Sequence, residues 1–89
     1  MNNIDTEDVI TKIFAEIRNY FRAEKKFPGF PTDPIHAASL LTEESGKLQK
    51  ACNKWVYENG DFKEIEKEAT QTTAMGLQFL FNLTKYKKN

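Results

Sequence analysis

Two clusters of helix-breaking residues divide this chain of 89 residues into three stretches. The first cluster holds all three prolines, at positions 28, 31 and 34, together with Gly29, and the second is Asn59-Gly60. A helix cannot run through either cluster, because proline forces the preceding residue toward extended backbone and Asn-Gly favours the left-handed conformation that ends helices. Within each stretch apolar residues recur at spacings of three and four, and nothing alternates as a strand does. The sequence therefore predicts an all-α protein with helices over about residues 5–25, 34–58 and 61–83.

Capping residues support these boundaries. Asp33 suits the N-cap of the second helix, with Pro34 at the first helical position, where the missing amide costs no hydrogen bond. Asp61 and Glu64, three apart, resemble a capping box at the start of the third helix. Gly60 fits the left-handed position just beyond the second helix.

The short length limits the core that one copy of the chain can bury. A domain of this size buries only about 60–65% of its unfolded surface. The second half of the third helix is apolar nearly all round, which is typical of a helix buried on more than one side, and Gly46 in mid-helix indicates a close packing contact. We expect one domain over residues 1–89, an antiparallel three-helix bundle completed by homo-oligomerisation as a dimer or tetramer. A lone three-helix bundle is the alternative.

Composition excludes several classes of function. The chain has 13 Lys plus Arg against 13 Asp plus Glu, so it lacks the basic footprint of a protein that binds polymeric nucleic acid. No apolar run is long enough to span a membrane, and residues 1–5 lack the basic start of a secretory signal, so a cytoplasmic location is expected. The single cysteine, Cys52, cannot form an internal disulfide.

Carboxylates are the best candidates for chemistry. The four glycines are too dispersed for a phosphate-binding loop, and His36 lies about 24 Å along the helix from Cys52, too far for a nucleophilic pair. Glu43 and Glu44 on the second helix can face Glu68 on the third, and carboxylates from facing helices often hold Mg²⁺. A solvated surface of Glu paired with neighbouring Lys explains the same spacing without a metal.

A family resemblance adds to this interpretation. The run from His36 to Ala51, followed by the run from Glu68 to Met75, resembles the MazG-like group of all-α nucleoside triphosphate pyrophosphohydrolases. The resemblance covers about residues 34–83. It implies a helical oligomer that uses Mg²⁺, held by an E-E-x-G-E-like stretch and an E-x-x-D pair, to split a triphosphate into a monophosphate and pyrophosphate.

The resemblance also assigns roles to individual residues. Glu44 and Glu68 match two of the four metal ligands, whereas Lys47 and Gln71 stand where the family carries the other two acids. Short phage-like chains of the group often read E-x-x-Q, which Gln71 matches. The four positions carry about −1 of charge in place of about −4, and a cation within the ligand shell opposes Mg²⁺ strongly.

Two hypotheses follow from these departures. In the first, the chain is a (deoxy)nucleoside triphosphate pyrophosphohydrolase with Glu44 and Glu68 as Mg²⁺ ligands, Glu64 as a substitute ligand and Glu43 as the base that orients water. In the second, it is a non-catalytic helical oligomer that binds a nucleotide or a protein partner. There Lys47 replaces the metal by bridging Glu44 and Glu68, and Lys47, Lys50 and Gln71 contact substrate in either case.

Overall fold

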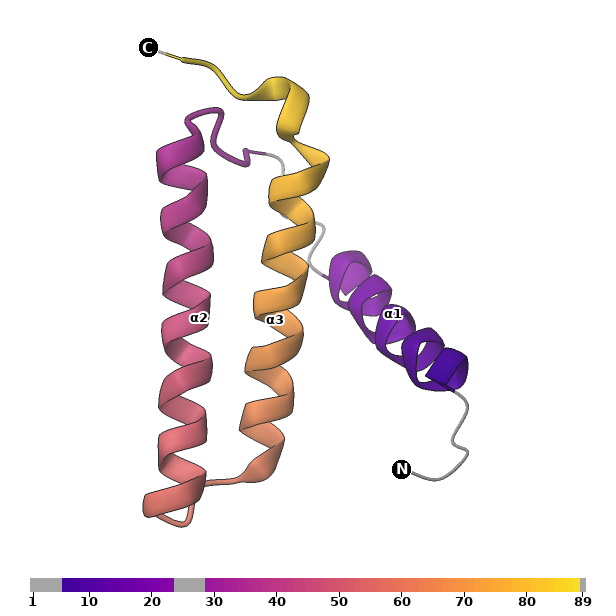
Figure 1. Cartoon of the computed structure of the whole chain (residues 1–89), viewed down its shortest axis with the longest axis vertical. Helices are drawn as coiled ribbons and strands as arrows, with labels where there is room; N and C mark the ends of the chain where they lie inside the picture. The colour runs from indigo at the N-terminus through magenta and orange to yellow at the C-terminus, as the bar shows by residue number, and fades with distance from the viewer. Residues whose placement is uncertain (1–5, 24–28, 89) are drawn as a thin grey trace.

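The computed structural model describes residues 6–23 and 29–88 (Figure 1). Over these residues the chain forms the helices α1 (Thr6–Ala23), α2 (Pro34–Tyr57) and α3 (Phe62–Phe81), followed by a 3-10 turn, η1 (Leu83–Lys85). The prediction of an all-α fold is confirmed. The helix bounds lie within two residues of those expected, and the predicted ends of the first helix, at 5 and 25, lie outside the described residues.

Helix α2 begins as its capping residues predict. Asp33 has extended backbone, and its carboxylate accepts a hydrogen bond from the Ile35 amide at 2.9 Å. Pro34 is the first helical residue, where an amide would have no intrahelical partner. Asp61 does the same for α3, accepting from the Lys63 amide at 2.9 Å. Both N-caps predicted from the sequence are confirmed.

The turn between α2 and α3 differs in detail from the prediction. Asn59, and not Gly60, adopts the left-handed backbone, with φ 61°. Gly60 is required for a different reason: its amide donates to the Lys54 carbonyl at 2.9 Å, and a Cβ there would lie 2.9 Å from the carbonyl carbon of Lys54. The left-handed position assigned to Gly60 was therefore wrong, and its close approach to α2 explains why the position takes glycine.

The three helices do not form the expected compact bundle. Helices α2 and α3 run antiparallel side by side as a hairpin, whereas α1 crosses obliquely against α3 (Figure 1). Within the described residues, no Cα atom of α1 lies within 8 Å of one in α2. Among the α1 side chains whose burial the structure describes, only Ile17 is buried, at 4% exposure, whereas Val9, Ile10, Ile13 and Phe14 are 40–53% exposed. The prediction of a three-helix antiparallel bundle is thus confirmed for one helix pair and wrong for α1.

The hairpin is closed by small residues. Ala37 and Ala51 of α2 and Ala74 of α3 are buried, and no large side chain of the described residues is fully buried. Trp55 is 48% exposed and packs edge-on against Phe62 with ring centroids 5.2 Å apart. A Cβ on Gly46 would meet nothing within 4 Å, so the close contact predicted there is absent from this protomer.

The C-terminal segment folds back over the open end of the hairpin. The Lys87 amide donates to the Thr32 carbonyl at 2.9 Å, which ties the segment to the loop before α2. The Tyr86 ring packs on Phe79 with centroids 4.8 Å apart, and its hydroxyl donates to the Phe79 carbonyl at 2.9 Å. Among the described helices, none has the length and apolar character needed to cross a bilayer.

Candidate functional site

Thr72 lies beside both predicted metal ligands, Glu44 on α2 and Glu68 on α3. Its hydroxyl lies 2.7 Å from the Glu68 carbonyl one turn back on α3, and 3.2 Å from the Glu44 carbonyl of α2. Threonine in a helix readily bonds the carbonyl four residues earlier, and here the same oxygen also reaches the neighbouring helix. Glu44 and Glu68 therefore lie at the same height of the α2–α3 hairpin, as the antiparallel arrangement predicts.

The carboxylates of this pair are partly withdrawn from solvent. The side chain of Glu44 is 15% exposed, and Glu68 is also partly buried. One oxygen of each, Oε2 of Glu44 and Oε1 of Glu68, is inaccessible to solvent and accepts no hydrogen bond from the protein. A buried acceptor left without a donor costs about 1–3 kcal/mol, and more when it is charged. Within the described part of the chain, these two oxygens are the buried side-chain polar atoms that lack a hydrogen-bond partner.

Lys47 contacts only one member of the pair. Its Nζ lies 3.4 Å from Oε1 of Glu44, one turn away on the same helix, and its side chain is 51% exposed. Among the interactions of the described residues, none joins Lys47 to Glu68. The predicted salt bridge across the two helices was therefore wrong: Lys47 pairs with a residue of its own helix, and the inner oxygens of both carboxylates stay without a partner.

A cleft of about 310 Å³ opens beside the carboxylate pair. Its walls are Lys47, Lys50, Ala51 and Lys54 from α2, and Glu64 and Glu68 from α3. The structure thus brings together two predicted substrate-binding residues, Lys47 and Lys50, with the predicted metal ligand Glu68 and with Glu64, the predicted substitute ligand. Lys54 completes the cleft. Lys54 was not among the predicted site residues, although its spacing from Lys47 and Lys50 along one helix face could have indicated it.

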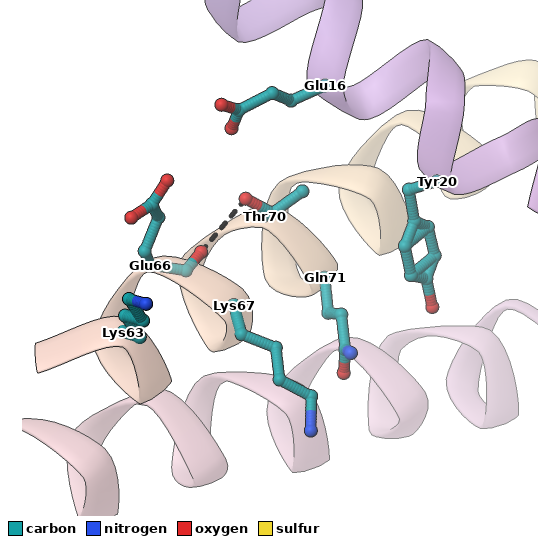
Figure 2. Close-up of a pocket in the computed structure, with 7 residues that line it drawn as sticks. All are labelled: Glu16, Tyr20, Lys63, Glu66, Lys67, Thr70 and Gln71. Carbon is teal, nitrogen blue, oxygen red and sulfur yellow. Dashed lines mark hydrogen bonds between the residues drawn. The ribbon is translucent and has the colours of Figure 1, made fainter. Parts of the chain in front are cut away.

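Two predicted site residues lie elsewhere. Gln71 lines a different cleft, of about 420 Å³, between α1 and α3, where it lies near Tyr20 and Lys67 (Figure 2). Glu43, the predicted base, is exposed on α2 and lines neither the cleft beside Glu68 nor the cleft between α1 and α3. Glu43 lies away from the carboxylate pair because successive residues of an α-helix point about 100° apart, so Glu43 and Glu44 cannot share one face.

The donor set on the hairpin suits a divalent cation shared with a ligand. Within residues 6–23 and 29–88, no group of three or more His, Cys, Asp or Glu side chains lies close enough to hold a metal. Mg²⁺, however, is commonly bound by one or two carboxylates together with water and substrate phosphates. The inner oxygens of Glu44 and Glu68 fit that two-carboxylate arrangement.

Comparison with known proteins assigns no family or function to the chain. No family model, no curated protein and no solved structure matches the chain.

Proposed function

We propose that this chain is a nucleotide-binding helical protein of the MazG-like type, which hydrolyses a nucleoside triphosphate to a monophosphate and pyrophosphate with Mg²⁺. The observation that carries the proposal is the pair of buried carboxylate oxygens without partners, contributed by Glu44 and Glu68 from facing helices. Folding tolerates such a cost where a site needs it, and carboxylate oxygens are ligands that Mg²⁺ prefers.

The charge distribution around the pair supports a phosphate ligand. Lys47, Lys50 and Lys54 line one wall of the adjoining cleft, and a row of ammonium groups on one helix face suits an extended polyphosphate. Glu68 belongs to both the carboxylate pair and the cleft. A triphosphate in the cleft therefore brings its oxygens to the carboxylates that would hold the cation.

Each group has a separate task in this arrangement. Glu44 and Glu68 would hold Mg²⁺, which supplies charge neutralisation at the phosphoryl group and lowers the pKa of bound water. Lys50 and Lys54 bind and orient the phosphate chain. Glu64, on the opposite wall, would accept the proton of the water that attacks the phosphoryl group. Glu43, which lies outside the cleft, has no part in it.

Activity on a panel of triphosphates tests the proposal. The full chain is incubated with Mg²⁺ and each ribo- and deoxyribonucleoside triphosphate, and monophosphate and pyrophosphate are measured. Turnover is expected for the wild type and lost in Glu68→Ala. Glu66→Ala is the matched control, because Glu66 is exposed on the α1 side of α3 and should leave turnover unchanged. Equal turnover in both variants would place the chemistry elsewhere.

A second function, nucleotide binding without hydrolysis, is favoured by the contact between Lys47 and Glu44. At 3.4 Å the lysine already neutralises one oxygen of the pair. The Lys47→Glu variant separates the two accounts. If Lys47 serves as a substitute cation, the variant should lose affinity for the triphosphate and gain none for Mn²⁺. If the pair is a metal site that Lys47 weakens, the variant should bind Mn²⁺ more tightly than the wild type.

A further inference from the structure

The cleft between α1 and α3, which the proposed function leaves unused, has the composition of a site for a flat, hydrogen-bonding ring. Its volume is about 420 Å³, within the range of about 300–1,000 Å³ usual for small-molecule sites. Tyr20 of α1 supplies an aromatic ring, and Gln71 and Lys67 of α3 supply an amide and an ammonium group. Proteins that recognise unpaired nucleobases combine an aromatic ring, on which the base stacks, with side chains that hydrogen-bond to its edge. We call these three residues the amide end of the cleft.

The carboxylates of the same cleft lie apart from the amide end. In Figure 2 the side chains of Lys67, Gln71 and Tyr20 point in one direction, and the carboxylates of Glu16 and Glu66 lie on the opposite side of the α3 ribbon. Helix periodicity accounts for this division. Lys67 and Gln71, four residues apart, point within about 40° of each other, whereas Glu66 and Gln71, five residues apart, point about 140° apart. The acidic groups therefore do not add acceptors to the amide end.

Donors outnumber acceptors at the amide end. The Lys67 ammonium only donates hydrogen bonds, and the Gln71 amide has two N–H donors and one carbonyl acceptor. Guanine, uracil and thymine carry a carbonyl oxygen beside a ring N–H, so they match this set: the N–H donates to Gln71 and the carbonyl accepts from Lys67. Adenine and cytosine carry an amino group in place of that carbonyl, and its N–H groups would face the ammonium without an acceptor. A mismatch that leaves buried polar groups unpaired discriminates strongly between ligands.

The amide end borders the lysine-lined cleft of the hairpin along α3. Lys67 lies three residues from Glu64, and Gln71 lies three residues from Glu68. Residues at this spacing are neighbours on a helix surface, with Cβ atoms about 5–6 Å apart. Glu64 and Glu68 line the hairpin cleft, so the α3 wall of that cleft continues into the amide end. A ligand with its phosphates along the lysines can extend its sugar and base across this face of α3.

We propose that the amide end of the α1–α3 cleft holds the base of the nucleotide and selects guanine, uracil or thymine over adenine and cytosine. The Tyr20 ring stacks on the base, the Gln71 carbonyl accepts from its ring N–H, and Lys67 donates to its carbonyl oxygen. This inference rests on the proposed function, because it assigns the base of the same triphosphate whose phosphates occupy the hairpin cleft.

Equilibrium titration of the full chain with single nucleotides tests the selection. In Mg²⁺, non-hydrolysable analogues of GTP and UTP should bind about tenfold more tightly than those of ATP and CTP. Lys67→Glu replaces a donor by an acceptor and should reverse this order. The matched control is Lys88→Glu, the same change of charge at an exposed residue of the C-terminal segment, which should keep the wild-type order. Equal affinity of the wild type for all four analogues, or an unchanged order in Lys67→Glu, overturns the proposal.

Inorganic tripolyphosphate, which has no base, separates the base site from the phosphate site. Tyr20→Leu should weaken binding of the GTP analogue about tenfold and leave the affinity for tripolyphosphate unchanged. Tyr20→Phe keeps the ring and should bind both as the wild type does. An equal loss of tripolyphosphate affinity in Tyr20→Leu contradicts the stacking role. If the wild type binds tripolyphosphate and the four analogues alike, the base site fails and the phosphate site stands. If it binds none of them, the proposed function fails and this inference fails with it.

Discussion

Replacing Glu68 by glutamine should have opposite effects on stability with and without a divalent cation. Glutamine keeps the shape of the side chain and removes its charge. In the wild type, Oε1 of Glu68 is buried with no donor, at a cost of about 1–3 kcal/mol. With the charge removed, we expect Glu68→Gln to gain about 1 kcal/mol in the absence of metal, which raises Tm by about 4–8 °C for a domain of this size.

Adding Mg²⁺ with a triphosphate should make the wild type more stable than Glu68→Gln. A ligand that binds only the folded state at 100 times its dissociation constant adds about 2.7 kcal/mol of stability. The wild type should gain this increment on addition of Mg²⁺ with a triphosphate, and Glu68→Gln should gain little because one of its two carboxylate ligands is gone. The wild type is then the more stable of the two, by about 1–2 kcal/mol once the charge effect is subtracted.

Calorimetric unfolding measures both halves of the prediction. The two proteins are compared at one fixed concentration, first in chelator and then in Mg²⁺ with the triphosphate, because association also shifts Tm. Glu66→Gln, at an exposed position of the same helix, should stay within about 0.5 kcal/mol of the wild type in both conditions. Two results would refute the reasoning: a loss of stability in Glu68→Gln without metal, or an equal gain from metal in both proteins.

Three further predictions concern the scaffold. Gly60→Ala should destabilise the fold by about 1–3 kcal/mol in thermal unfolding, because its Cβ meets backbone, whereas Gly46→Ala, with open space around it, should stabilise by about 0.5–1 kcal/mol. Asp61→Ala should cost about 1 kcal/mol through loss of the α3 N-cap, measured by urea unfolding. Partial burial raises the pKa of the Tyr86 phenol above its usual 10.0, so the stability it contributes is complete below pH 10.0 and is lost as the pH rises through the folded-state pKa. Tyr86→Phe should flatten that decline, and an equally steep decline in the variant would contradict the assignment.

Local signals were sufficient to predict the helices and their caps. Proline positions, Asp33 and Asp61 act through backbone geometry and short-range hydrogen bonds, which depend on a few neighbouring residues. The placement of α1 was not predictable in this way. Its apolar stripe shows that it packs on something, and the same stripe would serve a three-helix core or a second copy of the chain.

The candidate site was predictable at the level of which helices face each other. The spacing of Glu44 and Glu68 placed both on the inner surface of an antiparallel pair, and the Thr72 contact supports that register. The partner of Lys47 was not predictable, because a long flexible side chain can reach a neighbour on its own helix as easily as one across the interface. The same limit applies to Gln71, whose position one turn from Glu68 did not reveal that it lines the cleft beside α1.

Calorimetric titration of Mn²⁺ tests the central claim most directly. The claim is that Glu44 and Glu68 form a two-carboxylate cation site that a triphosphate completes. We predict weak binding of Mn²⁺ alone, much tighter binding in the presence of a non-hydrolysable triphosphate, and loss of that enhancement in both Glu44→Gln and Glu68→Gln, since the coupling between two ligands is reciprocal. Binding of Mn²⁺ that is unchanged by the triphosphate, or equally tight in both variants, would contradict the account.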